Sequence, residues 1–212
     1  PSLTIADNAP GDIDPQDGSI VFSGTIGDFV VEVNIGVTKP IFGTETQPSV
    51  SFSVNVFLGA TPGTSDIVVE FSDTDFVNSV PLVMSGDVSA NVSPSGQIEV
   101  FRDNGNTLFT KTNLEFDTGI ISSIFLGPES FTMNTSGDYS LTFVASMTVD
   151  SSSSGFIDVD VITVDKILAG ELLPTSQVSL LLGGLQTYSI WYLPIILSGV
   201  GLTIYKFRKN LN

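Results

Sequence analysis

The sequence predicts an all-β domain, an antiparallel β-sandwich, followed by one C-terminal transmembrane α-helix. Two observations predict the sandwich: short segments rich in Val, Ile and Phe alternate with turn residues from Ser2 to Asp165, and no amphipathic helical pattern interrupts them. The third observation predicts the helix, because the 28 residues from Val178 to Tyr205 carry no charge. An apolar run longer than roughly 18 residues can span a bilayer.

Alternation of apolar and polar residues is clearest in Phe29–Ile35 and Val50–Val56, and it places the apolar side chains on one face of each strand. Turn residues at 93–96, 103–106, 135–138 and 151–155 separate later strands. Greek-key or jelly-roll connectivity is favoured over a meander. The predicted strands are Ser19–Ser23, Phe29–Ile35, Val50–Leu58, Ile67–Phe71, Val80–Val92, Gln97–Phe101, Thr107–Phe109, Asn113–Phe116, Ser130–Met133, Tyr139–Val149 and Phe156–Val164. The predicted interior side chains are Phe29, Val31, Val33, Phe52, Val54, Val56, Val69 and Phe143.

Three regions follow from these patterns: a sandwich domain over residues 1–165, a juxtamembrane linker over 166–177, and a transmembrane helix with a short basic tail over 178–212. Aromatic residues belong at the outer membrane interface and basic residues on the cytoplasmic side. Small residues let a partner helix approach, and a proline within the helix requires a kink or packed neighbours. The interface anchors are Tyr188, Trp191, Tyr192, Lys206, Arg208 and Lys209, and the helix-packing residues are Pro194, Ser198, Gly199 and Gly201. The alternative is a buried core helix.

The orientation of this helix places the sandwich on the outer side of the membrane and the C-terminus in the cytoplasm. Before the anchor, Lys39, Arg102, Lys111 and Lys166 stand against all 23 carboxylates of the chain, a formal charge of −19. Such a field repels phosphate backbones, so nucleic acid is excluded as a partner. It attracts divalent cations and basic protein surfaces.

The sequence contains no histidine and no cysteine. Ser-His-Asp and Cys-His catalytic sets are therefore excluded, and so are zinc and copper sites built on imidazole or thiolate ligands. A pair of carboxylates could in principle cleave a glycosidic bond, but no pair has a reason to lie across a cleft. We expect a protein that is not an enzyme and needs no cofactor.

One acidic loop is a candidate calcium site. Asp7, Asp12, Asp14 and Asp17 lie in a stretch that also contains Asn, Pro and Gly, and calcium binds six to eight oxygen ligands of this kind. The spacing does not match an EF-hand loop. The alternative, which we favour, is an exposed turn whose Asp and Asn side chains fix the local backbone.

Two further acidic sets are more simply explained without a ligand. Asp158 and Asp160 point to the same side of a predicted strand and are expected to face solvent, with Asp165 near them. Asp73 and Asp75 lie within Phe71–Phe76, which we expect to form a turn.

Several segments, in their order along the chain, resemble a family of exported bacterial proteins that carry a PEP-CTERM sorting signal recognised by exosortase. The segments are Asp7–Asp12, Gly36–Pro40, Phe71–Phe76 and Asp103–Phe109. The resemblance implies an exported, β-rich envelope or matrix protein of a Gram-negative bacterium. The segment Leu172–Ser176 lacks the Pro-Glu-Pro tripeptide of that signal, and we expect the anchor to be retained.

Two functions remain open. In the first, the protein is a structural or accessory subunit of a membrane or surface assembly, and its C-terminal helix packs against a membrane protein complex or another copy of the chain in the lipid bilayer. In the second, it is a surface or matrix adhesin that binds polysaccharide or other cells, with calcium as a potential aid. The lack of tryptophan before the anchor, with Tyr139 its one tyrosine, disfavours the second.

Overall fold

The computed structural model describes residues 1–59, 63–78, 81–151 and 154–164, although the side chains of residues 32–34 and 164 are not described. These ranges contain ten β-strands and no helix, and all the strand pairings are antiparallel, so the prediction of an all-β antiparallel fold is confirmed. The strands are β1 (Ser19–Ile26), β2 (Phe29–Val37), β3 (Ser49–Leu58), β4 (Thr64–Asn78), β5 (Leu82–Asn91), β6 (Pro94–Asp103), β7 (Asn113–Asp117), β8 (Ile124–Met133), β9 (Gly137–Asp150) and β10 (Ser154–Val164).

The predicted linker over 166–177 and the predicted membrane helix over 178–212 lie outside the described residues, together with every interface anchor and helix-packing residue assigned above. Within the described ranges, no helix has the length and apolar character needed to cross a bilayer. The membrane anchor therefore stays a prediction.

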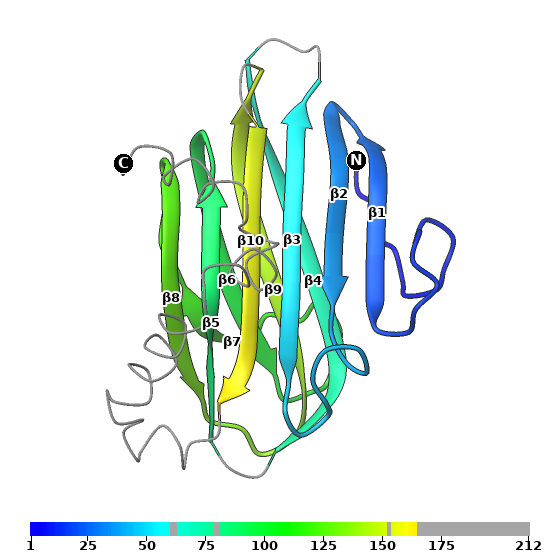
Figure 1. Ribbon diagram of the computed structural model, residues 1–212, viewed down its shortest axis with the longest axis vertical. Coiled ribbons are helices and arrows are strands. Elements are labelled where there is room, and N and C mark those ends of the chain that lie inside the picture. The colour runs from blue at the N-terminus through cyan, green and yellow to red at the C-terminus, as the bar shows by residue number, and fades with distance from the viewer. Residues whose placement is uncertain (60–62, 79–80, 152–153, 165–212) are drawn as a thin grey trace, which may run out of the picture. The chain divides into compact units, whose positions relative to one another are not determined.

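The strands form two sheets that face each other (Figure 1). The six-stranded sheet has the order β1-β2-β3-β10-β5-β8, and the four-stranded sheet behind it has the order β4-β9-β6-β7. From β3 onwards the chain passes repeatedly from one sheet to the other, so the fold is not a meander. The last strand, β10, lies between β3 and β5 and closes the middle of the larger sheet.

The space between the sheets is filled by the apolar faces of the strands. Side chains at alternate positions of β3 and β10 are buried, because the period of two directs every second residue inward, whereas β9 is buried at every position from Tyr139 to Ala145 and alternates only after it. Phe52 of β3 and Phe71 of β4 stack across the two sheets with ring centroids 6.1 Å apart. Of the predicted interior residues, Phe29, Val31, Phe52, Val54, Val56 and Phe143 are buried, Val69 is half-buried against the core, and the side chain of Val33 is not described.

Two local predictions were wrong. The segment Phe71–Phe76 is not a turn but the second half of β4, which continues to Asn78 through a bulge between Asp73 and Phe76. The bulge places Asp75 at φ +61°. Aspartate adopts this left-handed conformation more readily than most residues, so the strand can continue beyond the bulge. The segment Thr107–Phe109 is not a strand, because Asn106 and Phe109 both have positive φ and turn the chain instead.

We predict that Phe52→Ala lowers the free energy of unfolding by about 3–5 kcal/mol, because it leaves a cavity beneath the Phe71 ring at a side chain that is 2% exposed. Phe57→Ala is the matched control, because Phe57 lies on the same strand but faces away from the core and is only half-buried. Urea denaturation of the full chain, followed by far-UV circular dichroism, measures both changes. Equal losses in the two variants would contradict the assignment of the interior face.

Candidate functional site

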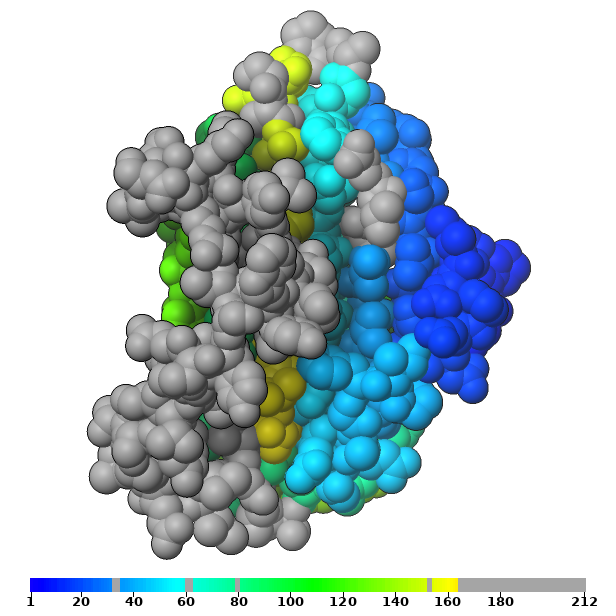
Figure 2. Space-filling view, viewed as in Figure 1, coloured from blue at the N-terminus to red at the C-terminus, as the bar shows by residue number. Residues whose placement is uncertain are grey.

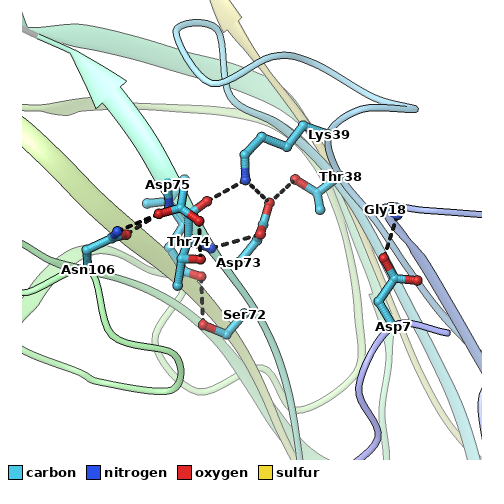
Figure 3. A network of polar contacts seen from close by, with 10 residues as sticks. Asp7, Gly18, Thr38, Lys39, Ser72, Asp73, Thr74, Asp75 and Asn106 are labelled. Carbon is cyan, nitrogen blue, oxygen red and sulfur yellow. Dashed lines mark hydrogen bonds and ion pairs between the residues drawn. The ribbon is translucent and has the colours of Figure 1, made fainter. Parts of the chain in front are cut away.

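A polar network joins the end of β2 to the bulge of β4 and to the loop after β6 (Figure 3). We call the residues Thr38, Lys39, Ser72–Asp75 and Asn106 the polar junction. Three of the segments that carry the family resemblance, Gly36–Pro40, Phe71–Phe76 and Asp103–Phe109, meet here. The tertiary structure thus brings together motifs that are 30 or more residues apart in the chain.

Lys39 lies at the centre of the polar junction. Its ammonium group is 2.8 Å from Oδ2 of Asp73, donates a hydrogen bond to the carbonyl of Thr74, and lies 4.4 Å from the centroid of the Phe76 ring. The hydroxyl of Thr38 donates a further hydrogen bond of 3.1 Å to the same Asp73 oxygen. These contacts hold the segment that follows β2 of the larger sheet against the bulge in β4 of the smaller sheet.

Asp75 and Asn106 are held by a reciprocal pair of hydrogen bonds. The backbone N–H of Asp75 donates to Oδ1 of Asn106, and Nδ2 of Asn106 donates to Oδ1 of Asp75, both at 2.8 Å. The pKa of Asp75 is lowered by its hydrogen bonds from Asn106 and Thr74 and, less strongly, by the charge of Lys39, against a smaller opposing effect of burial. The Ser72 hydroxyl accepts a hydrogen bond from the N–H of Phe109, so the loop after β6 is attached to β4 at two points.

The N-terminal loop lies along β1 at the edge of the larger sheet (Figure 2). It connects to the polar junction through Gly18, whose N–H donates to Oδ2 of Asp7 at 2.7 Å and whose carbonyl accepts from the N–H of Thr38. Gly18 has φ +87°, and a Cβ there would lie 2.3 Å from the carbonyl oxygen of Lys39. No residue other than glycine fits this position without a shift of the backbone.

The four candidate calcium ligands accept hydrogen bonds from within this loop and from β1. Asp12 accepts hydrogen bonds from the backbone N–H groups of Asn8, Asp14 and Val21. Burial raises the pKa of Asp12, but the hydrogen bonds together have the larger effect, so its pKa is lowered. Asp14 receives the N–H of Gln16, and Asp17 receives the side-chain amide of Asn8. Across the described ranges, no three acidic side chains are grouped so that they could hold a metal ion. The prediction for Asp7, Asp12, Asp14 and Asp17, an exposed turn favoured over a calcium site, stays untested.

A second acidic group lies on the outer face of the larger sheet. Asp160 of β10 is directly opposite Asp87 of β5, and Asp158 lies two residues further along the same face of β10. The pKa of Asp158 is raised to about 6, first by burial and then by the charge of Asp160, while a hydrogen bond from Ser53 opposes the shift. The expectation that Asp158 simply faces solvent was therefore incomplete, because this carboxyl is partly buried beside a like charge.

The outer face of the smaller sheet contains an open hollow of about 340 Å³. Its floor is Ser146 and Thr148 of β9, and its sides are residues of β4 and β6 together with Ile120 from the loop after β7. The residues that line it are Asp66, Ile67, Val68, Ser95, Gly96, Gln97, Ile120, Ser146, Met147 and Thr148. Sequence reasoning missed this hollow, because its polar residues are scattered over three strands and form no motif.

The cations of the described domain are all used in ion pairs. Residues 1–164 contain three, and Lys39 pairs with Asp73, Arg102 with Glu115, and Lys111 with Glu70. Arg102 and Glu115 are 2.7 Å apart, and their side chains are mostly buried between β6 and β7. The surface of the domain therefore presents negative charge without free positive groups.

No family model and no curated protein matches the sequence. Among solved structures, the chain is similar to TmCBM61, solved in complex with β-1,4-galactotriose, with 11% identity, a TM-score of 0.31, and coverage of 73% of this chain and 90% of that one. It is also similar to an isomalto-dextranase of Arthrobacter globiformis T6 complexed with panose, with 10% identity, a TM-score of 0.25, and coverage of 69% of this chain but 20% of that one. Likeness this low does not extend to ligands or activities.

We predict that Lys39→Ala lowers the free energy of unfolding by about 1–3 kcal/mol, because it leaves the Asp73 carboxylate without its cation in a mostly buried setting. The control is Lys111→Ala, which removes a more exposed ion pair to Glu70 and should cost about 0–1 kcal/mol. Urea denaturation of both variants measures the difference. A Lys39 variant no less stable than the Lys111 variant would show that the polar junction does not stabilise the fold.

We predict that Asp158→Asn stabilises the protein at pH 7.5 and has little effect at pH 4. The folded pKa of Asp158 lies above its unfolded value, so the folded state binds the proton more tightly, and stability falls as pH rises from about 4 to about 6. Because solvent partly screens this group, the gain at pH 7.5 should be about 1 kcal/mol. Melting temperatures at both pH values test this, with the exposed Asp138→Asn as control. A gain at pH 4 as large as that at pH 7.5 would refute it.

Proposed function

We propose that the protein is a non-enzymatic, exported structural or accessory subunit of a larger membrane or cell-surface assembly. The sandwich stands outside the bilayer, in the periplasm or at the cell surface. Residues 178–212 anchor it in the inner membrane, with the basic tail in the cytoplasm. In this proposal the C-terminal helix binds the partner complex or a second copy of the chain, and the sandwich covers the outer face of the assembly.

The observation that carries the proposal is the use of the three cations. Lys39, Arg102 and Lys111 are each bonded to a carboxylate within the domain, and two of these pairs join segments 34 and 41 residues apart. In addition, no buried polar side-chain atom in the described ranges lacks a hydrogen-bond partner. A catalytic centre requires titratable groups that converge on open space, whereas these groups are bonded to one another. The arrangement favours a rigid body over a reactive one.

The charge of the domain agrees with a surface-exposed position. Residues 1–164 contain 21 carboxylates against three cations, a formal charge of −18. A charge of this size keeps a domain soluble and repels other anions, including anionic lipid headgroups. The sandwich would therefore stand away from an anionic membrane surface, and its attachment would depend on the apolar helix rather than on lipid contacts of the domain.

The predicted helix supplies the means of assembly. Ser198, Gly199 and Gly201 are small residues grouped within four positions, and such residues allow close contact between helices in a bilayer. The neighbouring Pro194 is tolerated in a membrane helix when packed neighbours satisfy the freed backbone carbonyl.

Purification of the full chain from membranes in a mild detergent, with mass spectrometry of the proteins that accompany it, tests the proposal. We predict that Gly199→Leu reduces recovery of the partner, or of the self-associated form, because the larger side chain blocks close helix contact. Val200→Leu is the matched control, because it replaces one bulky apolar side chain with another at the adjacent position.

Three results would overturn the proposal. The first is a chain purified without any partner and with no self-association. The second is equal recovery of the partner with Gly199→Leu and with the wild-type chain. The third is an intact mass that places the C-terminus near residue 175, because cleavage there would release the domain from the membrane.

A further inference from the structure

The hollow on the outer face of β4, β9 and β6 presents hydrogen-bonding groups that the fold itself does not use. The hydroxyls of Ser95 and Ser146 line it and form no hydrogen bond within the described part of the chain. Gln97 donates its amide N–H to Oδ1 of Asp117, which leaves its carbonyl oxygen free to accept. Asp66 accepts the Thr148 hydroxyl on Oδ1 at 2.7 Å, and its second oxygen remains open.

We propose that this hollow binds a neutral, hydroxyl-rich glycan. The inference extends the proposed surface subunit by giving it a ligand. It does not depend on the identity of the membrane partner, so the two can fail separately.

The polar groups of the lining, set in a surface that is mostly apolar, suit a ligand that both donates and accepts hydrogen bonds and also has apolar C–H faces. The oxygens of Gln97 and Asp66 accept from ligand hydroxyls, and the hydroxyls of Ser95 and Ser146 can donate to ligand oxygens or accept from them. Neighbouring hydroxyl groups on a sugar ring offer donors and acceptors with this alternation. Apolar ligands would instead leave these groups without partners, which costs free energy.

Two exposed aliphatic side chains supply an apolar surface beside the polar floor. Val68 of β4 is 55% exposed and Ile120 is 80% exposed, and both belong to the lining of the hollow. The C–H faces of a sugar ring can pack on such side chains, and burying their area contributes to binding. These two aliphatic side chains take the place of the aromatic side chains whose scarcity before the anchor disfavours a polysaccharide-binding role in the sequence.

The surroundings of the hollow select against the other partner classes. The lining contains no cation and the domain carries a formal charge of −18, so an acidic polysaccharide is repelled. A peptide that adds a strand requires the unpaired backbone of a sheet edge, but the floor strand β9 is paired on both sides, to β4 and β6. On the floor of the hollow, recognition therefore depends on side chains, and most of the side chains in the lining are uncharged.

The test is retention of the full chain, in mild detergent, on a panel of neutral polysaccharides that includes cellulose, starch, xylan and galactan. Alginate serves as the polyanionic comparison and polylysine as the cationic one. We expect retention on at least one neutral polysaccharide, weakened about tenfold or more by Ser146→Leu, because the larger side chain fills the floor of the hollow. Ser85→Leu is the matched control, since Ser85 lies on a central strand of the other sheet and on its outer face.

The inference is overturned if no neutral polysaccharide retains the chain, if alginate or polylysine alone retains it, or if both leucine variants weaken retention equally. Circular dichroism establishes that each variant is folded. If Ser146→Leu does not fold, Gln97→Ala decides, because it removes an amide at a half-exposed position without adding bulk. Unchanged retention with a folded Gln97→Ala would then count against the hollow. Co-purification of the membrane partner together with failed glycan retention would remove this inference and leave the proposed subunit function intact.

Discussion

Burial of one apolar face from every long strand between the two sheets is the constraint on which this structure depends. A sheet that is apolar on one face must cover that face, and here each sheet covers the other. The Phe52–Phe71 stack marks where the two faces meet. The same constraint fixes which side chains face outward, and it thereby determines the acidic group around Asp158 and the hollow around Ser146.

The polar junction solves a problem that the two-sheet arrangement creates. The chain leaves β2 at one sheet and must be held against β4 of the other, and Lys39 makes this connection through Asp73, Thr74 and Phe76. A bulge in β4 is what turns the Asp73 and Asp75 side chains toward their partners. The described domain has three cations, and one of them, Lys39, lies where the two sheets are joined.

The outer surface has a different character from the interior and the junction. The surface presents carboxylates and scattered hydroxyls, because the three cations of the described domain each pair with a carboxylate of the same domain. This separation underlies both proposals. One is a rigid body carried on a membrane anchor. The other is a hollow without cations in an acidic surface, where a neutral ligand meets little competition from anions.

The sequence by itself determined the all-β class, most strand positions and six of the eight predicted interior residues, because a period of two is a local property that a single strand displays. It also excluded histidine- and cysteine-based chemistry. Only the tertiary structure decided the position of β10 between β3 and β5, the continuation of β4 through Phe71–Phe76, and the meeting of Lys39, Asp73 and Asn106. The hollow belongs with these. Its residues come from four separate segments, 66–68, 95–97, 120 and 146–148, and their proximity arises from strand pairing that no local pattern specifies.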